Sequence, residues 1–442
     1  MKVLYFYFIY GIIDLEYLGG TRMEIKKLKS ARGTVTVPGD KSISHRAVML
    51  GSLADGVTEI TGFLSGADCL STIDCFRNMG IEIDVCGDKV TVRGKGMRGL
   101  IKPAKTLYTG NSGTTTRLLC GILSAQPFDT EITGDASICK RPMGRVTKPL
   151  SMMGANIENE YCPLYIHGSH LHGIDYKMPV ASAQVKTAII LAGLYAEGET
   201  VVREIEKSRD HTELMLGAMG ADISVTGLDV TVRTTNNLSS VNVDVPGDIS
   251  SAAFFMVLGS IMPNSEITIK NVGTNPTRTG IIDVLKDMGA DMRLENERVS
   301  AGESVADITI KSSTLKGTTI GGDIIPRLID ELPIIAVAAV FAEGQTVIKD
   351  AQELKVKETN RIRAVVDEFK KCGIDITETD DGMIINGGKS IHSANFKTYG
   401  DHRMAMSLTV LAQLADGVST LDDDGCARVS YPTFFDDFYS LG

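Results

Sequence analysis

The chain has 442 residues, a net charge of −10, 43% hydrophobic residues, 6% aromatic residues and no tryptophan. This length allows two or three domains with separate cores, which excludes a disulfide-stapled peptide, and the apolar content excludes a disordered chain. Because the overall charge repels polyanions, a general nucleic-acid binder is excluded, and an anionic ligand needs a local group of cations.

The first 22 residues differ in character from the rest of the chain. The segment 3–13 (VLYFYFIYGII) is apolar, but it is shorter than the ~20 residues that span a bilayer. A regular strand-like pattern begins only at Met23. We therefore interpret 1–22 as a non-native or disordered extension before a natural start at Met23, with a signal-like segment that lacks a cleavage site as the alternative.

A pattern of about 70 residues recurs along the chain. Each copy predicts a strand, then a helix that ends just before a glycine, then a returning strand. The sequence therefore predicts an α/β protein of six compact units. The pairs expected to close the helices are Met79-Gly80, Met153-Gly154, Met219-Gly220, Met288-Gly289, Cys372-Gly373 and, more weakly, Leu441-Gly442.

A second repeat predicts how the units are grouped. Residues 37–52 (VPGDKSISHRAVMLGS) and 245–260 (VPGDISSAAFFMVLGS) agree at eight of sixteen positions without a gap. We interpret them as equivalent crossing points between two domains of three units each, which act as a hinge for closure around a ligand. The expected first domain is discontinuous, 23–40 plus 247–442, and the second is 41–246, with the active site in the cleft between them.

The first of these segments also carries cations. A turn that caps a helix would explain its Pro-Gly-Asp sequence, but the second copy has Ile249 and Phe254 in place of Lys41 and Arg46. The repeated architecture therefore explains the turn, but it does not explain the two cations, which we attribute to function. The residue before Lys41 is not the glycine that a nucleotide P-loop requires, so a P-loop is excluded.

Six further motifs place basic or short polar residues beside glycine, proline or a predicted helix start. Each alone could be an ordinary cap, a basic turn or an exposed charged helix face. Together they supply the cations and helix N-termini that two anionic groups in one cleft require. The motifs are GNSGTTTR (110–117), KRPMGR (140–145), SAQVK (182–186), SRDHTE (208–213), KVKETNR (355–361) and GDHRMAM (400–406).

Local spacing predicts helix caps and one unusual carboxylate. Lys357 and Arg361 should lie one turn apart on a helix. Asp330 precedes a long apolar helix, so it either caps that helix or, beside an apolar wall, has a raised pKa and acts as a base. The predicted caps are Asn111, Ser182, Ser208 and Asp401.

Taken in order from residue 23 onward, the seven motifs resemble those of the 5-enolpyruvylshikimate-3-phosphate synthases, a family of enolpyruvyl transferases. The resemblance implies a two-domain inside-out α/β barrel of six βαβαββ units, three per domain. It implies transfer of the enolpyruvyl group of phosphoenolpyruvate to the 5-hydroxyl of shikimate 3-phosphate with release of phosphate. This reaction belongs to the shikimate pathway, which leads to chorismate and the aromatic amino acids.

The resemblance also assigns roles to residues. Asp330 would take the proton of the attacking hydroxyl, and Glu358 with Lys41 would handle the proton of the methylene carbon. Shikimate 3-phosphate would be held by Lys41, Ser42, Arg46, Ser182, Gln184, Arg209, Asp330 and Lys357. Phosphoenolpyruvate would contact Lys41, Asn111, Gly113, Arg141, Gln184, Arg361, His402 and Arg403.

Cofactors and partners follow from the same reading. The resemblance implies no metal and no organic cofactor. The eight cysteines include no CxxC pair, so we expect reduced thiols and a cytoplasmic location. We expect a monomer that binds the two small substrates and neither nucleic acid nor a membrane.

Two other functions are alternatives. The related enolpyruvyl transferase that acts on UDP-N-acetylglucosamine usually has a cysteine five residues before the Arg-Pro pair, whereas Cys139 lies two residues before Arg141. A non-catalytic ring of six repeats is disfavoured by the negative net charge and by the cations concentrated in motifs. Ala183, where many members have a second serine, resembles a subgroup often tolerant of glyphosate, but Gly113 leaves room where tolerant members commonly carry alanine, so sensitivity to glyphosate stays open. The C-terminal lysine of many members is not matched at 426–430, and whether Arg428 replaces it stays open.

Overall fold

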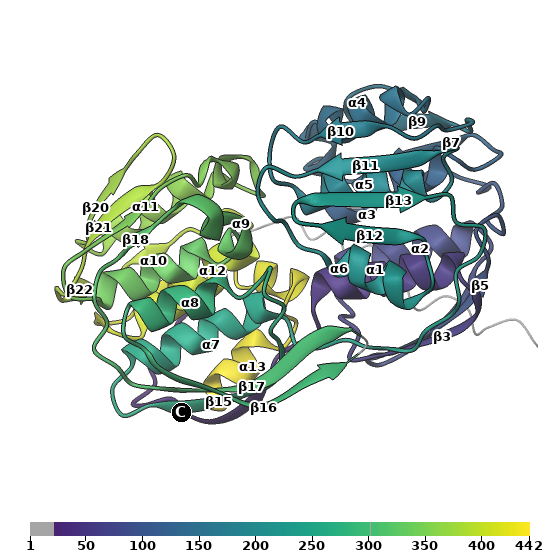
Figure 1. The fold of residues 1–442 in the computed structure, drawn as a ribbon. Coiled ribbons are helices and arrows are strands. Elements are labelled where there is room, and N and C mark those ends of the chain that lie inside the picture. Colours follow the sequence, from purple (N-terminus) through teal and green to yellow (C-terminus); the bar gives the residue numbers. More distant parts are fainter. Residues whose placement is uncertain (1–21, 301) are drawn as a thin grey trace, which may run out of the picture.

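The protein consists of two lobes that lie side by side (Figure 1). The structure, a computed structural model, describes residues 22–300 and 302–442, so the interpretation of 1–22 concerns a segment that, apart from Arg22, lies outside the described residues. Each lobe has its own cluster of buried apolar side chains. One cluster spans 43–245 and defines the continuous lobe. The other combines 25–37 with 249–441 and defines the discontinuous lobe.

The continuous lobe contains six helices and three sheets. Its helices are α1 (Lys41–Leu53), α2 (Ala67–Asn78), α3 (Gly113–Leu123), α4 (Gly144–Met152), α5 (Ala183–Gly193) and α6 (His211–Ala218), with the 3-10 helix η1 (Ile138–Lys140). Its strands are β3 (Asp55–Thr61), β4 (Glu82–Cys86), β5 (Lys89–Lys95), β6 (Leu107–Tyr108), β7 (Thr130–Thr133), β8 (Asn156–Glu158), β9 (Leu164–His167), β10 (Asp175–Lys177), β11 (Glu199–Arg203), β12 (Ile223–Thr226), β13 (Asp229–Arg233) and β14 (Val243–Asp244).

The described residues of the discontinuous lobe form seven helices and four sheets. Its helices are α7 (Ile249–Ile261), α8 (Gly280–Asp287), α9 (Ile325–Leu328), α10 (Leu332–Phe341), α11 (Arg361–Lys371), α12 (His402–Ala412) and α13 (Phe434–Tyr439), with 3-10 helices η2 (Gly322–Ile324), η3 (Gln352–Val356) and η4 (Gly425–Val429). Its strands are β1 (Met23–Glu24), β2 (Arg32–Thr36), β15 (Glu266–Gly273), β16 (Asp291–Ser300), β17 (Glu303–Lys311), β18 (Thr319–Ile320), β19 (Gln345–Ile348), β20 (Asp375–Glu378), β21 (Met383–Asn386), β22 (Ile391–His392), β23 (Asn395–Phe396), β24 (Ala415–Asp416) and β25 (Thr420–Leu421).

Five of the six repeated units form a four-stranded sheet with one topology. The orders are β14-β3-β5-β4, β6-β7-β9-β8, β10-β11-β13-β12, β16-β17-β15-β2 and β18-β19-β21-β20. In the second of these sheets, for example, β6 pairs parallel with β7, and the remaining pairs are antiparallel. The sixth sheet is split into β22-β24 and β1-β25-β23. This arrangement agrees with the predicted α/β class and its repeated units.

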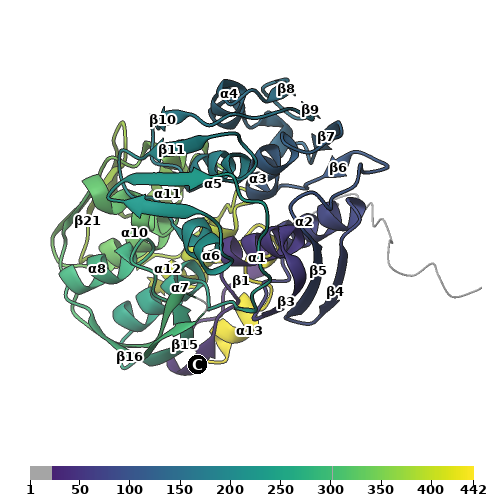
Figure 2. The ribbon, with the colours of Figure 1, turned by 45° about the vertical axis from the view of Figure 1, so that its right-hand side comes forward.

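Buried helices fill the inside of each lobe, and the sheets lie outside them (Figures 1 and 2). Helices α1, α3 and α5 are buried almost throughout, as are α7, α10 and α12 of the discontinuous lobe. Helix α10, LPIIAVAAVF, is apolar on all faces, whereas α1 and α12 also bury polar side chains near their starts. Within 22–300 and 302–442, however, no helix is long and apolar enough to cross a membrane.

The glycines of the repeat end helices as predicted. Helix α2 stops at Asn78, Met79 follows as the C-cap, and Gly80 has a φ of +88°. This left-handed conformation favours glycine, because a side chain there would be strained. Gly154, Gly220, Gly289 and Gly373 repeat it with φ of +95°, +85°, +92° and +76°. The sixth pair does not, because α13 ends at Tyr439 with Ser440 as its C-cap.

Two segments connect the lobes, and they pair with each other. The Asp40 amide donates to the Pro246 carbonyl, and the Asp248 amide donates to the Pro38 carbonyl, both at 2.8 Å. The strand before each crossing also pairs with a strand that follows the other crossing: β2 with β15, and β14 with β3. The predicted domain boundaries at 40/41 and 246/247 fall within these paired segments.

Candidate active site

The predicted site residues cluster at the N-terminal ends of helices. Free amides and the helix dipole make such ends favourable for anions. Short polar side chains cap them: Asp40 accepts from the Ile43 amide in α1, and Asp401 accepts from the Arg403 amide in α12. Ser182 likewise accepts from the Val185 amide in α5, so the predicted caps Ser182 and Asp401 are confirmed. Lys41, Gly113, Arg361 and His402 are the first residues of their helices, and Gln184 is the second of its helix.

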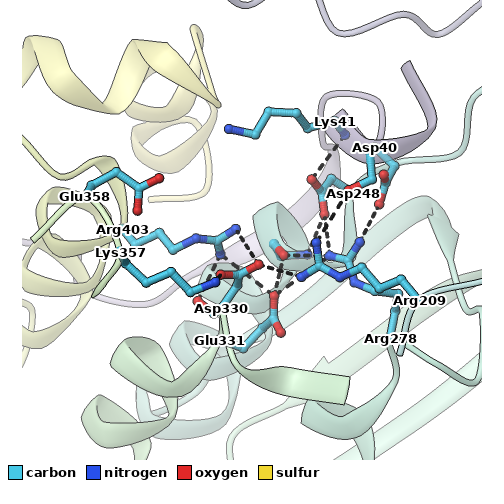
Figure 3. Close-up of polar contacts among 12 residues, drawn as sticks. Asp40, Lys41, Arg209, Asp248, Arg278, Asp330, Glu331, Lys357, Glu358 and Arg403 are labelled. Carbon is cyan, nitrogen blue, oxygen red and sulfur yellow. Dashed lines mark hydrogen bonds and ion pairs between the residues drawn. The ribbon is translucent and has the colours of Figure 1, made fainter. Parts of the chain in front are cut away.

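Asp330 is the meeting point of cations from both lobes (Figure 3). Arg209 of the continuous lobe approaches Asp330 Oδ2 to 2.5 Å. From the discontinuous lobe, Lys357 Nζ lies 3.2 Å and Arg361 Nη1 3.4 Å from Oδ1. Arg403 donates to the Asp330 backbone carbonyl at 3.0 Å. This part of the site therefore favours the phosphate or carboxylate groups of a ligand.

The environment of Asp330 contradicts one prediction. Burial raises its pKa, but Lys357, Arg403, Arg209 and Arg361 outweigh burial and hold the pKa well below its usual range. The expected raised pKa is therefore wrong, because the apolar helix lies on one side only and cations face the carboxylate on the other. Asp330 is not the cap of that helix either: α10 has Glu331 at its N-cap position, without a side-chain cap bond.

Glu358 is held as an anion by Arg361. Arg361 is 1% exposed and donates from Nη2 to Glu358 Oε2 at 2.6 Å and from Nε to Asp401 Oδ2 at 2.8 Å. Burial raises the pKa of Glu358, but Arg361 and other nearby cations hold it well below its usual range. At neutral pH this carboxylate can therefore accept a proton but has none to give.

Lys41 is a charged group paired with an acidic side chain. Its Nζ lies 3.1 Å from Asp68 Oδ2. Burial lowers the pKa of Lys41, but Asp68 and Glu358 raise it by more than burial lowers it. The net shift of the pKa is therefore upward, and the ammonium stays charged. His402 faces it from α12, and burial together with Lys41 lowers the pKa of His402 to about 3. Lys41 and Glu358 thus come from different lobes and lie close enough to influence each other.

A second group lies at the start of α3. Arg141 Nη2 donates to Asn111 Oδ1 at 2.7 Å. Arg117 Nη1 donates to Gln184 Oε1 at 2.9 Å, which links α3 to α5. A methyl group added at Gly113 would lie 2.5 Å from Arg117 Nη1 and 3.5 Å from Arg141 Nη1, so the glycine keeps space open between two cations. Burial, and then Arg141, lowers the pKa of Arg117 to about 10.

Arg46 supports the site from inside the continuous lobe. Its Nε donates to Thr212 Oγ1 at 2.7 Å, and its Nη1 donates to the Ser42 carbonyl at 3.0 Å. Burial lowers its pKa to about 10. Arg209 Nη1 lies 3.4 Å from Ser42 Oγ, so Ser42 is in contact with both arginines.

Three local predictions are wrong, because the helices concerned begin at other residues or are capped by another side chain. Ser112, not Asn111, caps α3 by accepting from the Thr115 amide. Ser208 caps no helix: α6 begins at His211, and the Ser208 amide donates to Glu204 at 3.0 Å. Lys357 lies before α11, whose cap is Asn360, so it does not share that helix with Arg361.

Sequence reasoning also missed members of the site. Asp68 lies in none of the motifs, and Arg117 belongs to the motif GNSGTTTR but had no assigned role. Lys186 of the SAQVK motif is fully buried, and its Nζ lies 3.0 Å from Glu204 and 2.7 Å from Glu213, which anchors the loop before Arg209. In the part of the chain that the structure describes, no group of three or more His, Cys, Asp or Glu could hold a metal ion.

A buried histidine beneath the site predicts a pH dependence of stability. His45 is fully buried, with Nδ1 2.7 Å from Thr72 Oγ1. Burial, helped by Lys41 and Arg46, lowers its pKa to about 3. In the unfolded chain His45 takes up a proton near pH 6.5, whereas in the folded chain it stays neutral down to about pH 3. The free energy of unfolding therefore decreases as the pH falls from about 6.5 toward 3.

We expect His45→Gln to reduce this acid sensitivity. Between pH 7 and pH 5 the variant should lose about 2 kcal/mol less unfolding free energy than the unchanged protein. Denaturant unfolding at each pH measures the difference. Equal losses in both proteins would show that His45 carries a proton in the fold.

Comparisons with known proteins identify the family that the chain resembles. A family model described as EPSP synthase (3-phosphoshikimate 1-carboxyvinyltransferase) matches residues 25–438. A 3-phosphoshikimate 1-carboxyvinyltransferase from Thermoanaerobacter pseudethanolicus is 56% identical over 95% of this chain and 100% of its own. One from Geobacillus kaustophilus is 58% identical over 94% and 98%. A solved EPSP synthase structure from Acinetobacter baumannii matches with a TM-score of 0.86 and 48% identity over 95% of this chain and 98% of its own.

Proposed function

The chain belongs to the EPSP synthase (3-phosphoshikimate 1-carboxyvinyltransferase) family, and on that premise we propose how its residues divide the reaction between two lobes. The predicted resemblance and fold class are confirmed. The enzyme transfers the enolpyruvyl group of phosphoenolpyruvate to the 5-hydroxyl of shikimate 3-phosphate and releases phosphate, in the shikimate pathway to chorismate and the aromatic amino acids.

Shikimate 3-phosphate binds where Arg209 and Lys357 share the Asp330 carboxylate. The observation that carries this assignment is the convergence of these cations from two lobes, at 2.5 and 3.2 Å from one acidic side chain. A phosphate that enters beside them replaces a shared ion pair by charge-assisted bonds of its own. The remaining proposed contacts on this substrate are Lys41, Ser42, Arg46, Ser182 and Gln184.

Phosphoenolpyruvate binds between the start of α3 and the discontinuous lobe. Arg141 and Gly113 lie beside Arg117, and the other lobe supplies Arg361 and Arg403, which both bond Asp330. The two charged groups of a small dianion need such paired cations, which also withdraw electrons from the reacting carbon. Asn111, Gln184, Lys41 and His402 complete the proposed contacts, to which Arg117 is added.

Proton transfer follows from the charges of three groups. In the addition step the 5-hydroxyl attacks C2 of phosphoenolpyruvate and gives its proton to Asp330, while Lys41 protonates C3. In the elimination step Glu358 takes a proton from C3, the double bond re-forms, and the C–O bond to phosphate breaks. The charged ammonium and the ionised carboxylate support this division. The phosphate of bound substrate offsets the cations around Asp330 and so strengthens that carboxylate as a base.

Phosphate release tests the function. Purified protein with both substrates should release phosphate, and neither substrate alone should do so. The main alternative acceptor is UDP-N-acetylglucosamine, and turnover with that compound in place of shikimate 3-phosphate would overturn the assignment. We propose further that the enzyme is a monomer, because one chain supplies every residue of the proposed site. We also propose that it acts in the cytoplasm and binds no nucleic acid.

The space at Gly113 yields a sharper test. In Gly113→Ala the new methyl group pushes the Arg117 guanidinium away from Gln184 and narrows the phosphoenolpyruvate site. We expect the KM for phosphoenolpyruvate to rise roughly tenfold, with a much smaller change for shikimate 3-phosphate. Steady-state kinetics with each substrate varied in turn measure this.

Gly217→Ala is the matched control. Gly217 lies in α6, where an added methyl group meets nothing within 4 Å. The Gly217→Ala enzyme should have the same kinetic constants as the unchanged enzyme. A Gly113→Ala enzyme with unaltered KM for phosphoenolpyruvate would remove Gly113 from the proposed substrate site.

A further inference from the structure

A buried arginine outside the substrate contacts joins the two crossing segments. Arg278 lies between β15 and α8 and is 3% exposed. Its Nη1 donates to Asp40 Oδ2 at 2.9 Å, and its Nη2 lies 3.3 Å from Asp248 Oδ1. Asp40 and Asp248 occupy equivalent positions in the two copies of the repeated segment, and each caps the helix that follows it. One guanidinium therefore bridges the caps of α1 and α7 (Figure 3).

The same guanidinium is linked to the carboxylate beside Asp330. Nη2 of Arg278 donates to Ser250 Oγ at 2.8 Å, and the Ser250 hydroxyl in turn donates to Glu331. Glu331 is 1% exposed and lies 3.8 Å from Arg403 Nη1. Arg278 thus connects to two of the three proposed proton-transfer groups through their chain neighbours: Asp40 precedes Lys41, and Glu331 follows Asp330.

We propose that Arg278 is a positioning residue that fixes Lys41 and Asp330 relative to each other across the two crossing segments. The inference rests on the proposed roles of Lys41 and Asp330. Neither the motifs nor the comparisons assign this residue a role.

Through these bonds Arg278 holds both the start of α1 and the two crossing segments. The Lys41 amide donates to Asp248 Oδ2 at 3.4 Å, so the start of α1 is held by a side chain from the other crossing segment. Asp248 in turn is held by Arg278. Because α1 carries Lys41 from the continuous lobe while Asp330 belongs to the discontinuous lobe, a shift of this joint changes the distance between the two groups.

Charge explains why no neutral side chain can replace it. Asp40, Asp248 and Glu331 are three buried carboxylates around one fork-shaped cation. Burial lowers the pKa of Arg278, but these carboxylates raise it more strongly, so the guanidinium stays charged. Without it the carboxylates repel one another, which shifts the starts of α1 and α7 relative to each other.

The test compares Arg278→Gln and Arg278→Lys with the unchanged enzyme, after phosphate release by the latter has been established. Arg278→Gln should lower kcat by about 10- to 100-fold, the effect typical of residues that orient reacting groups. The KM values and the affinity for shikimate 3-phosphate, measured by calorimetry, should change by less than about threefold. Arg278→Lys keeps the charge but loses the fork, so its kcat should lie between the other two.

Glu368→Gln is the control for a purely structural effect. Glu368 is fully buried in α11 and accepts from Tyr399 Oη and the Lys397 amide, both at 2.9 Å, away from the proposed site. This variant should lose thermal stability and keep its kcat.

The outcomes separate this inference from the function. An unchanged enzyme that releases no phosphate contradicts the function itself. An active enzyme whose Arg278 variants keep a normal kcat, or lose affinity alone, contradicts only the positioning role. If Arg278→Gln does not fold, Arg278→Lys decides: reduced kcat at normal KM supports the inference, and normal kcat overturns it.

Discussion

Replacement of Lys41 by methionine should lower turnover by about a thousandfold or more and leave the fold intact. Methionine preserves the length and the apolar stem of the side chain but removes the ammonium that lies 3.1 Å from Asp68. The proposed mechanism needs this group to protonate the methylene carbon and to stabilise negative charge on the substrates.

Phosphate release under saturating substrates measures this effect, and circular dichroism with thermal melting checks the fold. Lys95→Met is the matched control in the same lobe, because Lys95 is exposed and its Nζ donates to a backbone carbonyl at Gly80. The control should retain full turnover. A Lys41→Met enzyme with a near-normal rate would exclude Lys41 from the chemistry.

Asp330→Asn should slow the reaction far more than it weakens binding. Asparagine keeps the shape of the side chain but cannot take the hydroxyl proton, so kcat should fall by about 10²- to 10⁴-fold. Arg209, Lys357 and Ser42 remain to hold shikimate 3-phosphate, and they lose a competing carboxylate. The KM for this substrate should therefore stay within about tenfold of its original value.

Steady-state kinetics separate the two effects. Asp307→Asn is the control: Asp307 is also a largely buried aspartate, bonded to Lys270 at 2.8 Å and to the Asn271 amide at 2.9 Å, but it belongs to the sheet of β17. The control should lose stability and keep kcat. An Asp330→Asn enzyme that changes only in KM would refute the role of Asp330 as the base.

Repeated features were predictable from sequence because they depend on local chemistry. A glycine after each helix end requires only a left-handed backbone position, which is why Gly80 and its four equivalents were identified correctly. The repeated Pro-Gly-Asp segment likewise indicated two equivalent places, and the structure pairs them through the Asp40 and Asp248 amides.

Features that depend on distant residues were not predictable. The pKa of Asp330 is set by Arg209, Lys357, Arg361 and Arg403, which lie between 27 and 121 positions away in the chain. Without the fold, the adjacent apolar helix was the only visible influence, and it pointed in the wrong direction. The bridge made by Arg278 has the same character, because Asp40 is 238 positions away from it.

Adjacent polar residues caused the smaller errors. Asn111 and Ser112 can both cap a helix, and the choice between them depends on which residue has an extended backbone. Ser112 does so in the structure and bonds the Thr115 amide. Spacing alone also could not show that α11 starts at Arg361 and leaves Lys357 outside it.

A crystal structure with shikimate 3-phosphate and phosphoenolpyruvate bound together tests the central claim most directly. We predict that each ligand touches both lobes: shikimate 3-phosphate between Arg209 and Lys357, and phosphoenolpyruvate between Arg141 and Arg403. A complex in which either ligand is held by one lobe alone, with the cations of the other lobe out of reach, would contradict the account.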